Sequence, residues 1–288
     1  MDASAPAPLC VLFDNGSLRP ESTLQLRLIA LQLQAAIGVT VRPVSLLHSS
    51  AIAPAELGGV PAQILEPALR SLLAAGTGPI VLLPLFFGPS AALTEYVPQR
   101  LDQLRRRYPT AGVQLGRCLV DTEDEADTRI AAIFADHVRT IIQRAGLTRP
   151  NTVLVDHGSP QREVVAVRDL LGRQLSRVLG PEIGRLGVAS MERRPESAYD
   201  FCEPLLATRL RQPEFSRGDV IVVRQFFFPG RHAGPEGDVA GICAAAERAQ
   251  PGLKCHLTDL IGEDPRLIDV LADRYAEARI RRSAGRSG

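Results

Sequence analysis

Short apolar runs alternate along the chain with longer stretches in which apolar residues recur every three or four positions. Short, nearly continuous apolar runs are typical of strands buried on both faces, whereas the wider spacing is typical of helices. In the first half, Leu24, Leu28, Leu31 and Ala35 fall on one face of a helix. The pattern predicts strands at 9–13, 39–47, 80–87 and 112–119, and helices at 24–35, 62–73, 96–108 and 127–144.

The second half repeats this order of elements. Its predicted strands are 152–156, 185–191, 219–228 and 253–257, and its predicted helices are 163–179, 196–211, 237–249 and 265–278. Apolar strands separated by helices indicate parallel sheets with helices on both faces. Gly146 and Pro150 interrupt the pattern and mark a boundary. The sequence therefore predicts an α/β protein of two similar three-layer domains, 1–147 and 148–288, with a cleft between them.

Two stretches of the chain are imperfect copies of each other. The first reads CVLFDNGS at 10–17 and the second reads TVLVDHGS at 152–159, so that Asn15 stands where the second copy has His157. This pairing corresponds to an offset of 157 − 15 = 142 residues. The repeated motif, together with the repeated order of elements, indicates an internal duplication.

The same offset, carried forward without a gap, pairs the apolar run 80–87 with 222–229. In this register Ser90 pairs with His232, so a second histidine is present only in the second copy. We therefore expect the second half to carry the chemistry and the first half to be mostly scaffold.

Composition narrows the class of protein. The chain has 288 residues, 45% of them hydrophobic and 23% charged, and a formal net charge of +1, which gives no bulk attraction for nucleic acid or an anionic membrane. Its five cysteines are scattered without a C-x-x-C pair, as expected for reduced thiols. The N-terminus lacks the pattern of a signal peptide, and no apolar run approaches the roughly 20 residues that span a bilayer. We expect a cytoplasmic protein without nucleic-acid or membrane partners.

Three side chains able to bind a metal follow the strands of the second half. His157 comes directly after the first strand, Glu192 ends the second, and His232 lies a few residues beyond the third. Ligands of open parallel sheets bind beyond the carboxyl ends of the strands, so these residues are expected to meet at one edge. Taken alone, each residue has a structural alternative. His157 could be a hydrogen-bonded structural histidine, Glu192 a solvated strand end, and His232 part of a glycine-rich loop.

Three motifs together resemble a known family, the ATP-independent (class II) tetrapyrrole chelatases, which include sirohydrochlorin cobaltochelatases and ferrochelatases. The resemblance is strongest over 153–271, and the long forms of the family are tandem duplications of one domain. It implies two chelatase-like domains, of which the first has a degenerate site, and it implies that His157, Glu192 and His232 bind the metal and are catalytic. The motifs are LVDHGS at 154–159, ASMERRPES at 189–197 and FFFPGRHA at 226–233, followed by Asp238 and Val239.

The implied reaction is insertion of a divalent metal into a sirohydrochlorin-type ring, in cobalamin or sirohaem biosynthesis. Neutral imidazole suits Co²⁺, Fe²⁺ and Ni²⁺, and two imidazoles with one carboxylate leave coordination positions open for the ring nitrogens. Co²⁺ is the expected metal, with Fe²⁺ or Ni²⁺ as alternatives. The chain has no phosphate-binding G-x-x-x-x-G-K-[ST] loop, so we expect no nucleotide.

Residues beside these ligands are candidates for substrate binding. A sirohydrochlorin-like ring carries many carboxylates, and the planar guanidinium group matches their geometry. We therefore predict contacts from Arg193, Arg194 and Arg231, with ordinary surface arginines as the alternative, and a further contact from Ser159.

The first copy departs from the family pattern. Asn15 and Ser90 replace the two histidines, and His48 stands near the place of Glu192. His48 is either a stray ligand or, as we expect, a capping or core histidine. The first half is then a wall of the cleft.

Two other functions compete with the chelatase. A carrier would bind the metal or the tetrapyrrole without insertion, and a hydrolase would use Ser159 with His157. The hydrolase is disfavoured because neighbouring side chains after a strand seldom reach each other and no G-x-S-x-G elbow is present. Oligomeric state stays open between a monomer and a weak homo-oligomer, and the duplication favours the monomer.

Overall fold

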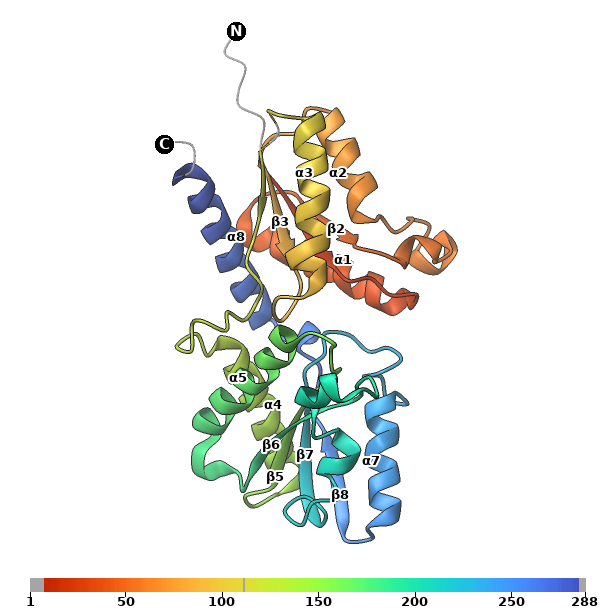
Figure 1. Ribbon diagram of the computed structural model, residues 1–288, viewed down its shortest axis with the longest axis vertical. Helices are drawn as coiled ribbons and strands as arrows, with labels where there is room; N and C mark the ends of the chain where they lie inside the picture. Colours follow the sequence, from red (N-terminus) through yellow and green to blue (C-terminus); the bar gives the residue numbers. More distant parts are fainter. Residues whose placement is uncertain (1–7, 111, 285–288) are drawn as a thin grey trace. The chain divides into compact units, whose positions relative to one another are not determined.

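The computed structural model describes residues 8–110 and 112–284, with side chains up to 281, and these form two parallel four-stranded sheets (Figure 1). The first sheet has the order β2-β1-β3-β4 and the second has the order β6-β5-β7-β8. The strands are β1 (Leu9–Asp14), β2 (Val41–Ser45), β3 (Ile80–Pro84), β4 (Val113–Leu115), β5 (Asn151–Asp156), β6 (Leu186–Ser190), β7 (Gly218–Arg224) and β8 (Leu253–Leu257). The predicted α/β fold with two duplicated parallel sheets is confirmed.

Eight α-helices cover these sheets in the described part of the chain. They are α1 (Pro20–Ile37), α2 (Leu65–Ala74), α3 (Val97–Arg107), α4 (Arg129–Ala145), α5 (Arg162–Leu179), α6 (Leu206–Arg209), α7 (Asp238–Ala249) and α8 (Arg266–Ala284). Short helical turns lie in the connections, among them η3 (Ala92–Tyr96), η5 (Ser197–Cys202) and η6 (Ile261–Glu263). None of the described helices combines the length and the apolar run that a membrane crossing requires.

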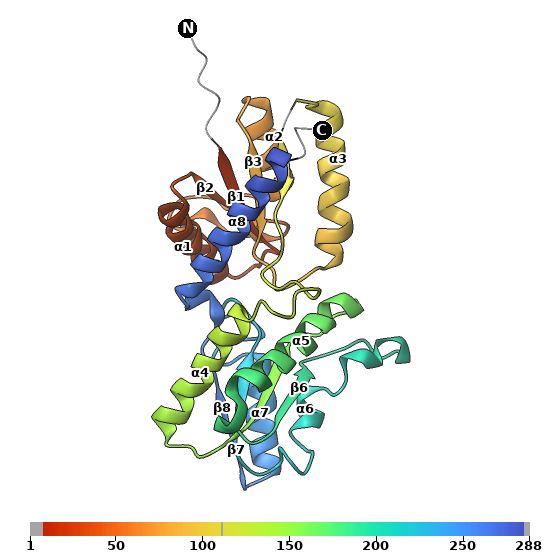
Figure 2. The ribbon, with the colours of Figure 1, turned by 90° about the vertical axis from the view of Figure 1, so that its left-hand side faces the viewer.

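Each sheet is the middle layer of three. In the first, Val11, Phe13 and Leu82 pack with apolar residues of α2 and α3, while α1 and α8 lie side by side on the opposite face (Figure 2). In the second, Val153 and Val222 pack with apolar residues of α6 and α7, while α4 and α5 pack together on the opposite face. Residues of β1 and β5 are buried on both faces, as their continuous apolar runs predict.

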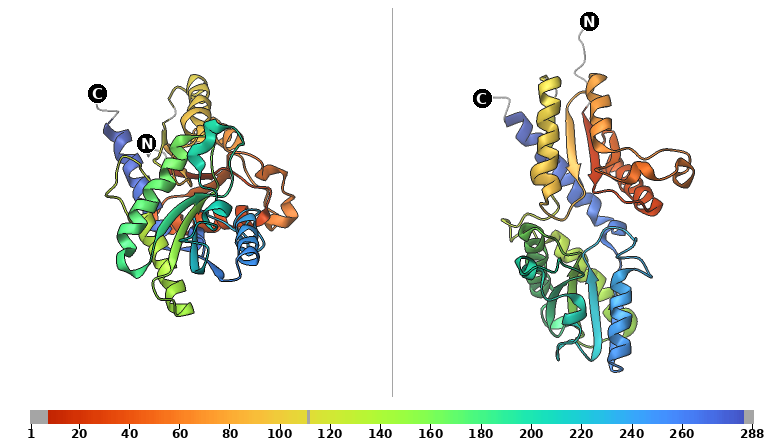
Figure 3. Two further views of the ribbon diagram at one scale, coloured as in Figure 1. Left: turned by 60° about the horizontal axis from the view of Figure 1, so that its bottom comes forward. Right: turned by 45° about the vertical axis from the view of Figure 1, so that its right-hand side comes forward.

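The compact units do not follow the two halves of the sequence. One unit comprises Met1–Leu119 and Pro265–Gly288, and the other comprises Val120–Asp264. The reason is that α8 packs on α1, β3 and β4, whereas α4 packs on α5 and β7 (Figure 3, right). The last helix of each sequence half thus covers the sheet of the other half. The boundary expected between 147 and 148 separates the repeats in the sequence but not these units.

Two predictions about individual elements are wrong. The helix expected at 196–211 is replaced by the turn η5 and the single-turn α6, with Pro204 between them. In α1, Leu24, Leu28 and Leu31 are 44%, 45% and 63% exposed, and the core face carries Leu26 and other buried residues instead. The periodicity was ambiguous because α1 has apolar residues on both faces.

One turn is built in the same way in both copies. Gly158, after β5, has a φ of +89°, and Gly16, after β1, has a φ of +91°. A Cβ atom on Gly158 would lie 1.9 Å from the carbonyl oxygen of Glu192, and one on Gly16 would lie 1.9 Å from that of Leu47. Both positions therefore exclude any side chain, through the backbone conformation and through the close approach of a neighbouring strand end.

We predict that Gly158→Ala lowers the free energy of unfolding by roughly 3 kcal/mol, because the variant has both the unfavourable φ and the collision with Glu192. Gly218→Ala is the matched control, since Gly218 has a φ of +73° but no atom within 4 Å of a built Cβ. The control should lose only the backbone term of about 1–2 kcal/mol. Equal losses in urea unfolding would show that the close approach contributes nothing.

Candidate functional site

His157 and Glu192 extend from adjacent parallel strands at the carboxyl edge of the second sheet. The ladder between β5 and β6 continues past both strands, because Met191 N–H donates to the Asp156 carbonyl at 2.8 Å and Glu192 N–H donates to the His157 carbonyl at 3.1 Å. This pairing holds the two side chains together, with His157 Nε2 3.5 Å from Glu192 Oε1. The sequence-based expectation that these residues meet at one edge agrees with this geometry.

His232 reaches the same place from the loop that follows β7. The rings of His157 and His232 lie edge to face, with centroids 4.7 Å apart. The loop is folded back on the start of α7, because Asp238 N–H donates to the Arg231 carbonyl and Val239 N–H donates to the His232 carbonyl. The structure therefore brings together all three residues predicted to bind a metal. Among the described residues, however, no three His, Cys, Asp or Glu side chains are arranged so that they could hold a metal ion as they stand.

The hydrogen bonds of the two histidines leave the same nitrogen available on each. His157 Nδ1 lies 3.0 Å from the carbonyl oxygen of Gly158, and His232 Nδ1 lies 2.6 Å from Asp238 Oδ2. An imidazole that donates from Nδ1 presents the lone pair of Nε2. The arrangement thus favours the tautomer in which both Nε2 atoms can bind a metal.

Asp238 contacts the candidate site, although the sequence reasoning gave it no role. It appeared there only as part of a motif, whereas its carboxylate orients His232 and also lies 3.8 Å from Arg231 Nε. A carboxylate that accepts the far N–H of a ligating histidine fixes the ring and raises its basicity. The signal available in the sequence was an acidic residue six positions after His232, at the start of a predicted helix.

The Ser159 side chain makes a structural hydrogen bond in the turn before α5. Its Oγ accepts the backbone N–H of Gln161 at 3.1 Å at the entry to α5, and Ser17 Oγ accepts the N–H of Arg19 at 3.0 Å in the first copy. Because both copies share the arrangement, it belongs to the scaffold. Contact between Ser159 and a substrate stays a prediction.

Arg193 is engaged in its own loop. Its guanidinium group contacts Glu203 at 2.7 Å and Asp200 at 3.2 Å, and it donates to the Arg194 carbonyl at 3.0 Å. The hydrogen bond with Arg193 holds the pKa of Glu203 below its usual range. These bonds fold the segment after Glu192 and occupy the donors that were expected to bind substrate carboxylates.

Arg194 and Arg231 are more accessible. Arg194 is exposed and lies over the ring of Tyr199, to whose hydroxyl oxygen it donates at 3.1 Å. The Arg231 side chain is 78% exposed beside His232. Both side chains are exposed, and each lies within two residues of a predicted metal ligand in the sequence. They are the stronger candidates for contacts with an anionic substrate.

The strand pairing corrects the comparison of the two copies. Phe13 pairs with Pro84, and Val155 pairs with Arg224, so the third strands correspond at an offset of 224 − 84 = 140 rather than 142. Carried forward from these strands, the offset pairs His232 with Ala92, whereas the ungapped offset pairs it with Ser90, and neither residue is a histidine. The ungapped register fails at the third strands because Phe13 and Pro84 are 84 − 13 = 71 positions apart, whereas Val155 and Arg224 are only 224 − 155 = 69 apart.

Leu47, not His48, occupies the place of Glu192. Leu47 N–H donates to the Asn15 carbonyl at 3.3 Å, in the way that Glu192 N–H donates to His157. His48 is exposed, has a φ of +68° and makes no side-chain capping bond, so it is neither the core nor the capping histidine that we expected. The first copy carries none of the three ligands at the corresponding positions.

Comparison with known proteins assigns the family. The model of the CbiX family matches twice, at residues 9–139 and 151–278, so the chain belongs to the CbiX family and contains its domain in duplicate. The two matches confirm the duplication expected from the sequence. No curated protein sequence matches the chain.

Solved structures share the fold over nearly the whole chain. SirB from Bacillus subtilis with Fe³⁺ is 14% identical, with a TM-score of 0.69, over 94% of this chain and 95% of that one. The sirohydrochlorin chelatase SirB from Bacillus subtilis subspecies spizizenii in complex with cobalt is 13% identical, with the same TM-score, over 94% of both chains. A multi-domain protein of Deinococcus radiodurans, similar in structure to chelatases, matches at 17% identity and a TM-score of 0.58, over 94% of this chain and 54% of its own.

We predict that Asp238→Ala weakens Co²⁺ binding about tenfold, because His232 loses the carboxylate that orients it. Binding is measured by titration, from the visible absorption of bound Co²⁺. Asp219→Ala is the matched control, since Asp219 Oδ1 lies 2.7 Å from His256 Nε2 at the other end of β7. The same Co²⁺ affinity in the two variants would contradict the role of Asp238.

We also predict a pH-dependent destabilisation from the first copy. Burial raises the pKa of Asp14 to about 6, although the Ser45 hydroxyl and the Gly16 N–H partly oppose the shift. The folded state therefore binds this proton more tightly than the unfolded chain. The contribution of Asp14 to the free energy of unfolding is fully present below the unfolded pKa near 3.8. It is lost as the pH rises through the folded pKa.

In wild type the loss amounts to roughly 2–3 kcal/mol between about pH 4 and pH 7. Asp14→Asn stays neutral, so the difference in unfolding free energy between variant and wild type should grow over this range in the variant's favour. A difference that does not change with pH would refute the prediction.

Proposed function

We propose that the protein inserts a divalent metal into a sirohydrochlorin-type tetrapyrrole without nucleotide, in cobalamin or sirohaem biosynthesis. Co²⁺ is the first choice of metal, with Fe²⁺ or Ni²⁺ as alternatives. The observation that carries the proposal is the convergence of His157, Glu192 and His232 at one sheet edge, in a chain of the CbiX family. Related folds were solved with Fe³⁺ and with cobalt, which supports the choice of metals.

The metal is a substrate in this reaction, so its site must release it. The Nε2 atoms of His157 and His232 and the carboxylate of Glu192 supply borderline nitrogen and hard oxygen donors that bind such ions reversibly. Three protein donors leave positions open for the ring nitrogens. A cysteine cage, by contrast, would hold the metal too tightly for transfer.

Insertion also requires that two pyrrole protons leave as the metal enters. Glu192 is suited to accept a proton because its side chain lies beside His157 and is 61% exposed. The proton can therefore pass from Glu192 to solvent. The second proton leaves to water, because His157 has no free lone pair when Nδ1 donates to the Gly158 carbonyl and Nε2 binds the metal. The metal is thus exchanged for two protons at the same place.

The carboxylates of the ring need cationic partners. Arg194 and Arg231 are exposed on the two loops that carry Glu192 and His232, so they can bind carboxylates on either side of the metal. Arg193 bonds within the loop that carries Glu192, and the Ser159 hydroxyl hydrogen remains able to donate to a substrate.

The test is anaerobic absorption spectroscopy of sirohydrochlorin with Co²⁺, Fe²⁺ or Ni²⁺ in turn. We expect wild type to accelerate metal insertion over the uncatalysed rate, and we expect His157→Ala and His232→Ala to lose roughly 100-fold or more of that acceleration. His48→Ala is the control, because His48 is an exposed histidine of the first copy. It should retain full activity.

The alternative outcomes are distinguishable. Tight binding of metal or ring without acceleration by any of the three metals would identify a carrier instead of a chelatase. Full activity in both histidine variants would show that insertion occurs elsewhere on the chain.

A further inference from the structure

A buried arginine lies behind the candidate site. Arg168 is on α5 and is 2% exposed, which is rare for this residue type. Its Nη1 donates to the Ser190 hydroxyl at 2.7 Å and to the Cys202 carbonyl at 3.0 Å, and its Nε and Nη2 donate to Asp169 Oδ1 at 2.9 and 2.7 Å. It also lies 4.0 Å from Asp156 Oδ1, next to His157.

The partners of Arg168 mark the two ends of one loop. Ser190 is the last residue of β6, and Cys202 is the last residue of η5. The loop between them, 191–201, carries Glu192 and Arg194. One guanidinium group therefore joins the base of the loop on both sides. Cys202 also donates from Sγ to the Ser159 carbonyl, which connects the same point to the turn after His157.

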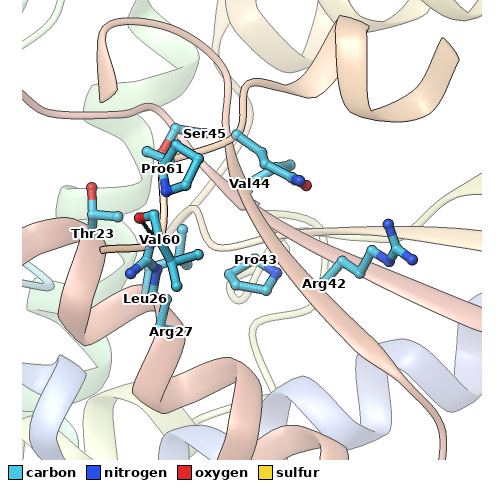
Figure 4. Close-up of a pocket in the computed structure, with 11 residues that line it drawn as sticks. Thr23, Leu26, Arg27, Arg42, Pro43, Val44, Ser45, Val60 and Pro61 are labelled. Atoms are coloured by element: carbon cyan, nitrogen blue, oxygen red, sulfur yellow. Dashed lines mark hydrogen bonds between the residues drawn. The ribbon is translucent and has the colours of Figure 1, made fainter. Parts of the chain in front are cut away.

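The first copy shows what the fold needs without this arginine. Helices α1 and α5 are both 18 residues long and begin at an offset of 162 − 20 = 142, so Leu26 corresponds to Arg168. The strand pairing makes Ser45 the counterpart of Ser190. Leu26 and Ser45 both line a cavity of about 270 Å³ (Figure 4). Ser49 donates to the Ser45 hydroxyl at 2.9 Å. A leucine therefore stands at the helix position of Arg168, while the next residue, Arg27, donates to the carbonyls of Leu57 and Val60 farther along the corresponding loop.

The cost of burying a charge makes this difference informative. Desolvation of a guanidinium group costs several kcal/mol, and apolar residues of similar volume often replace buried ion pairs without loss of stability. The arginine is present in the copy that has His157 and Glu192, and absent in the copy that has Asn15 and Leu47. The copies therefore differ both at the helix position of Arg168 and at the candidate site. They share the turn glycine and the serine at the end of the second strand.

We propose that Arg168 is a positioning residue that joins the two ends of the loop 191–201 and thereby holds Glu192 opposite His157. This inference rests on the proposed function of that site. Arg168 does not contact the metal or the ring itself. It acts through Glu192, by fixing the strand end from which that side chain projects.

The test uses a double-mutant cycle with Co²⁺ alone as the probe. Arg168→Leu, the residue of the first copy, should weaken Co²⁺ binding about tenfold in the presence of Glu192. In the Glu192→Ala background, the same change should have almost no effect, since the side chain that Arg168 positions is already gone. The absorption spectrum of Co²⁺ in Arg168→Leu should resemble that in Glu192→Ala. A purely structural role would give equal losses in both backgrounds and would overturn the proposal.

Arg209→Leu is the matched control. Arg209 is a half-buried arginine that donates from Nε and Nη2 to the Val188 carbonyl, on the same strand but away from the loop. Amide hydrogen exchange in 191–201 should increase in Arg168→Leu and stay at the wild-type level in Arg209→Leu. Arg168→Lys, which keeps the charge but cannot reach both ends of the loop, should fall between Arg168→Leu and wild type.

Failure of the inference and failure of the proposed function give different results. If wild type binds no Co²⁺, the proposed metal site is wrong, and the hydrogen exchange of the loop still tests Arg168. If wild type binds Co²⁺ but loop exchange is the same in Arg168→Leu and Arg209→Leu, the positioning role is wrong and the metal site stands.

Discussion

The contact between the turn at Gly158 and the carbonyl of Glu192 is the constraint on which the site depends. The backbone after β5 can turn there only because residue 158 is a glycine: a Cβ atom on it would lie 1.9 Å from that oxygen. The turn keeps the β5–β6 ladder intact for one residue beyond the strands, so His157 and Glu192 leave the sheet at the same level. The loop after β7 brings His232 to the same place, with its ring 4.7 Å from that of His157.

The duplication separates what the fold requires from what the chemistry requires. Gly16, Ser45 and Asp14 repeat Gly158, Ser190 and Asp156, so the turn and the buried polar groups at the strand ends belong to the repeated unit. Burial raises the pKa of both aspartates, which shows that both copies tolerate an electrostatic cost at the same place. The donors themselves, by contrast, are present in one copy. The first sheet therefore shows the repeated scaffold without the side chains of the candidate site.

Exchange of the terminal helices explains why the halves of the sequence are not the compact units. Arg274 of α8 is buried and donates to the carbonyls of Cys118 and Leu119, which fixes α8 within the unit of the first sheet. In the other unit, Gln174 of α5 donates to the carbonyls of Glu125 and Asp127, just before α4. Hydrogen bonds to backbone carbonyls thus hold the chain on both sides of the point, after Leu119, where it passes from the first unit to the second.

The sequence by itself determined the class of fold and the duplication, and it predicted which polar residues meet at the sheet edge, because these depend on local patterns: apolar runs, helical spacing, and polar residues directly after strands. It did not determine which apolar face of α1 is buried, which sheet α4 and α8 cover, or the register of the third strands, since periodicity identifies an apolar face without naming its partner. Only the tertiary structure decided that Arg193 bonds within its own loop, that Asp238 contacts His232, and that Arg168 joins Ser190 to the Cys202 carbonyl. Each of these contacts joins side chains to groups that only the folded chain brings within hydrogen-bond distance.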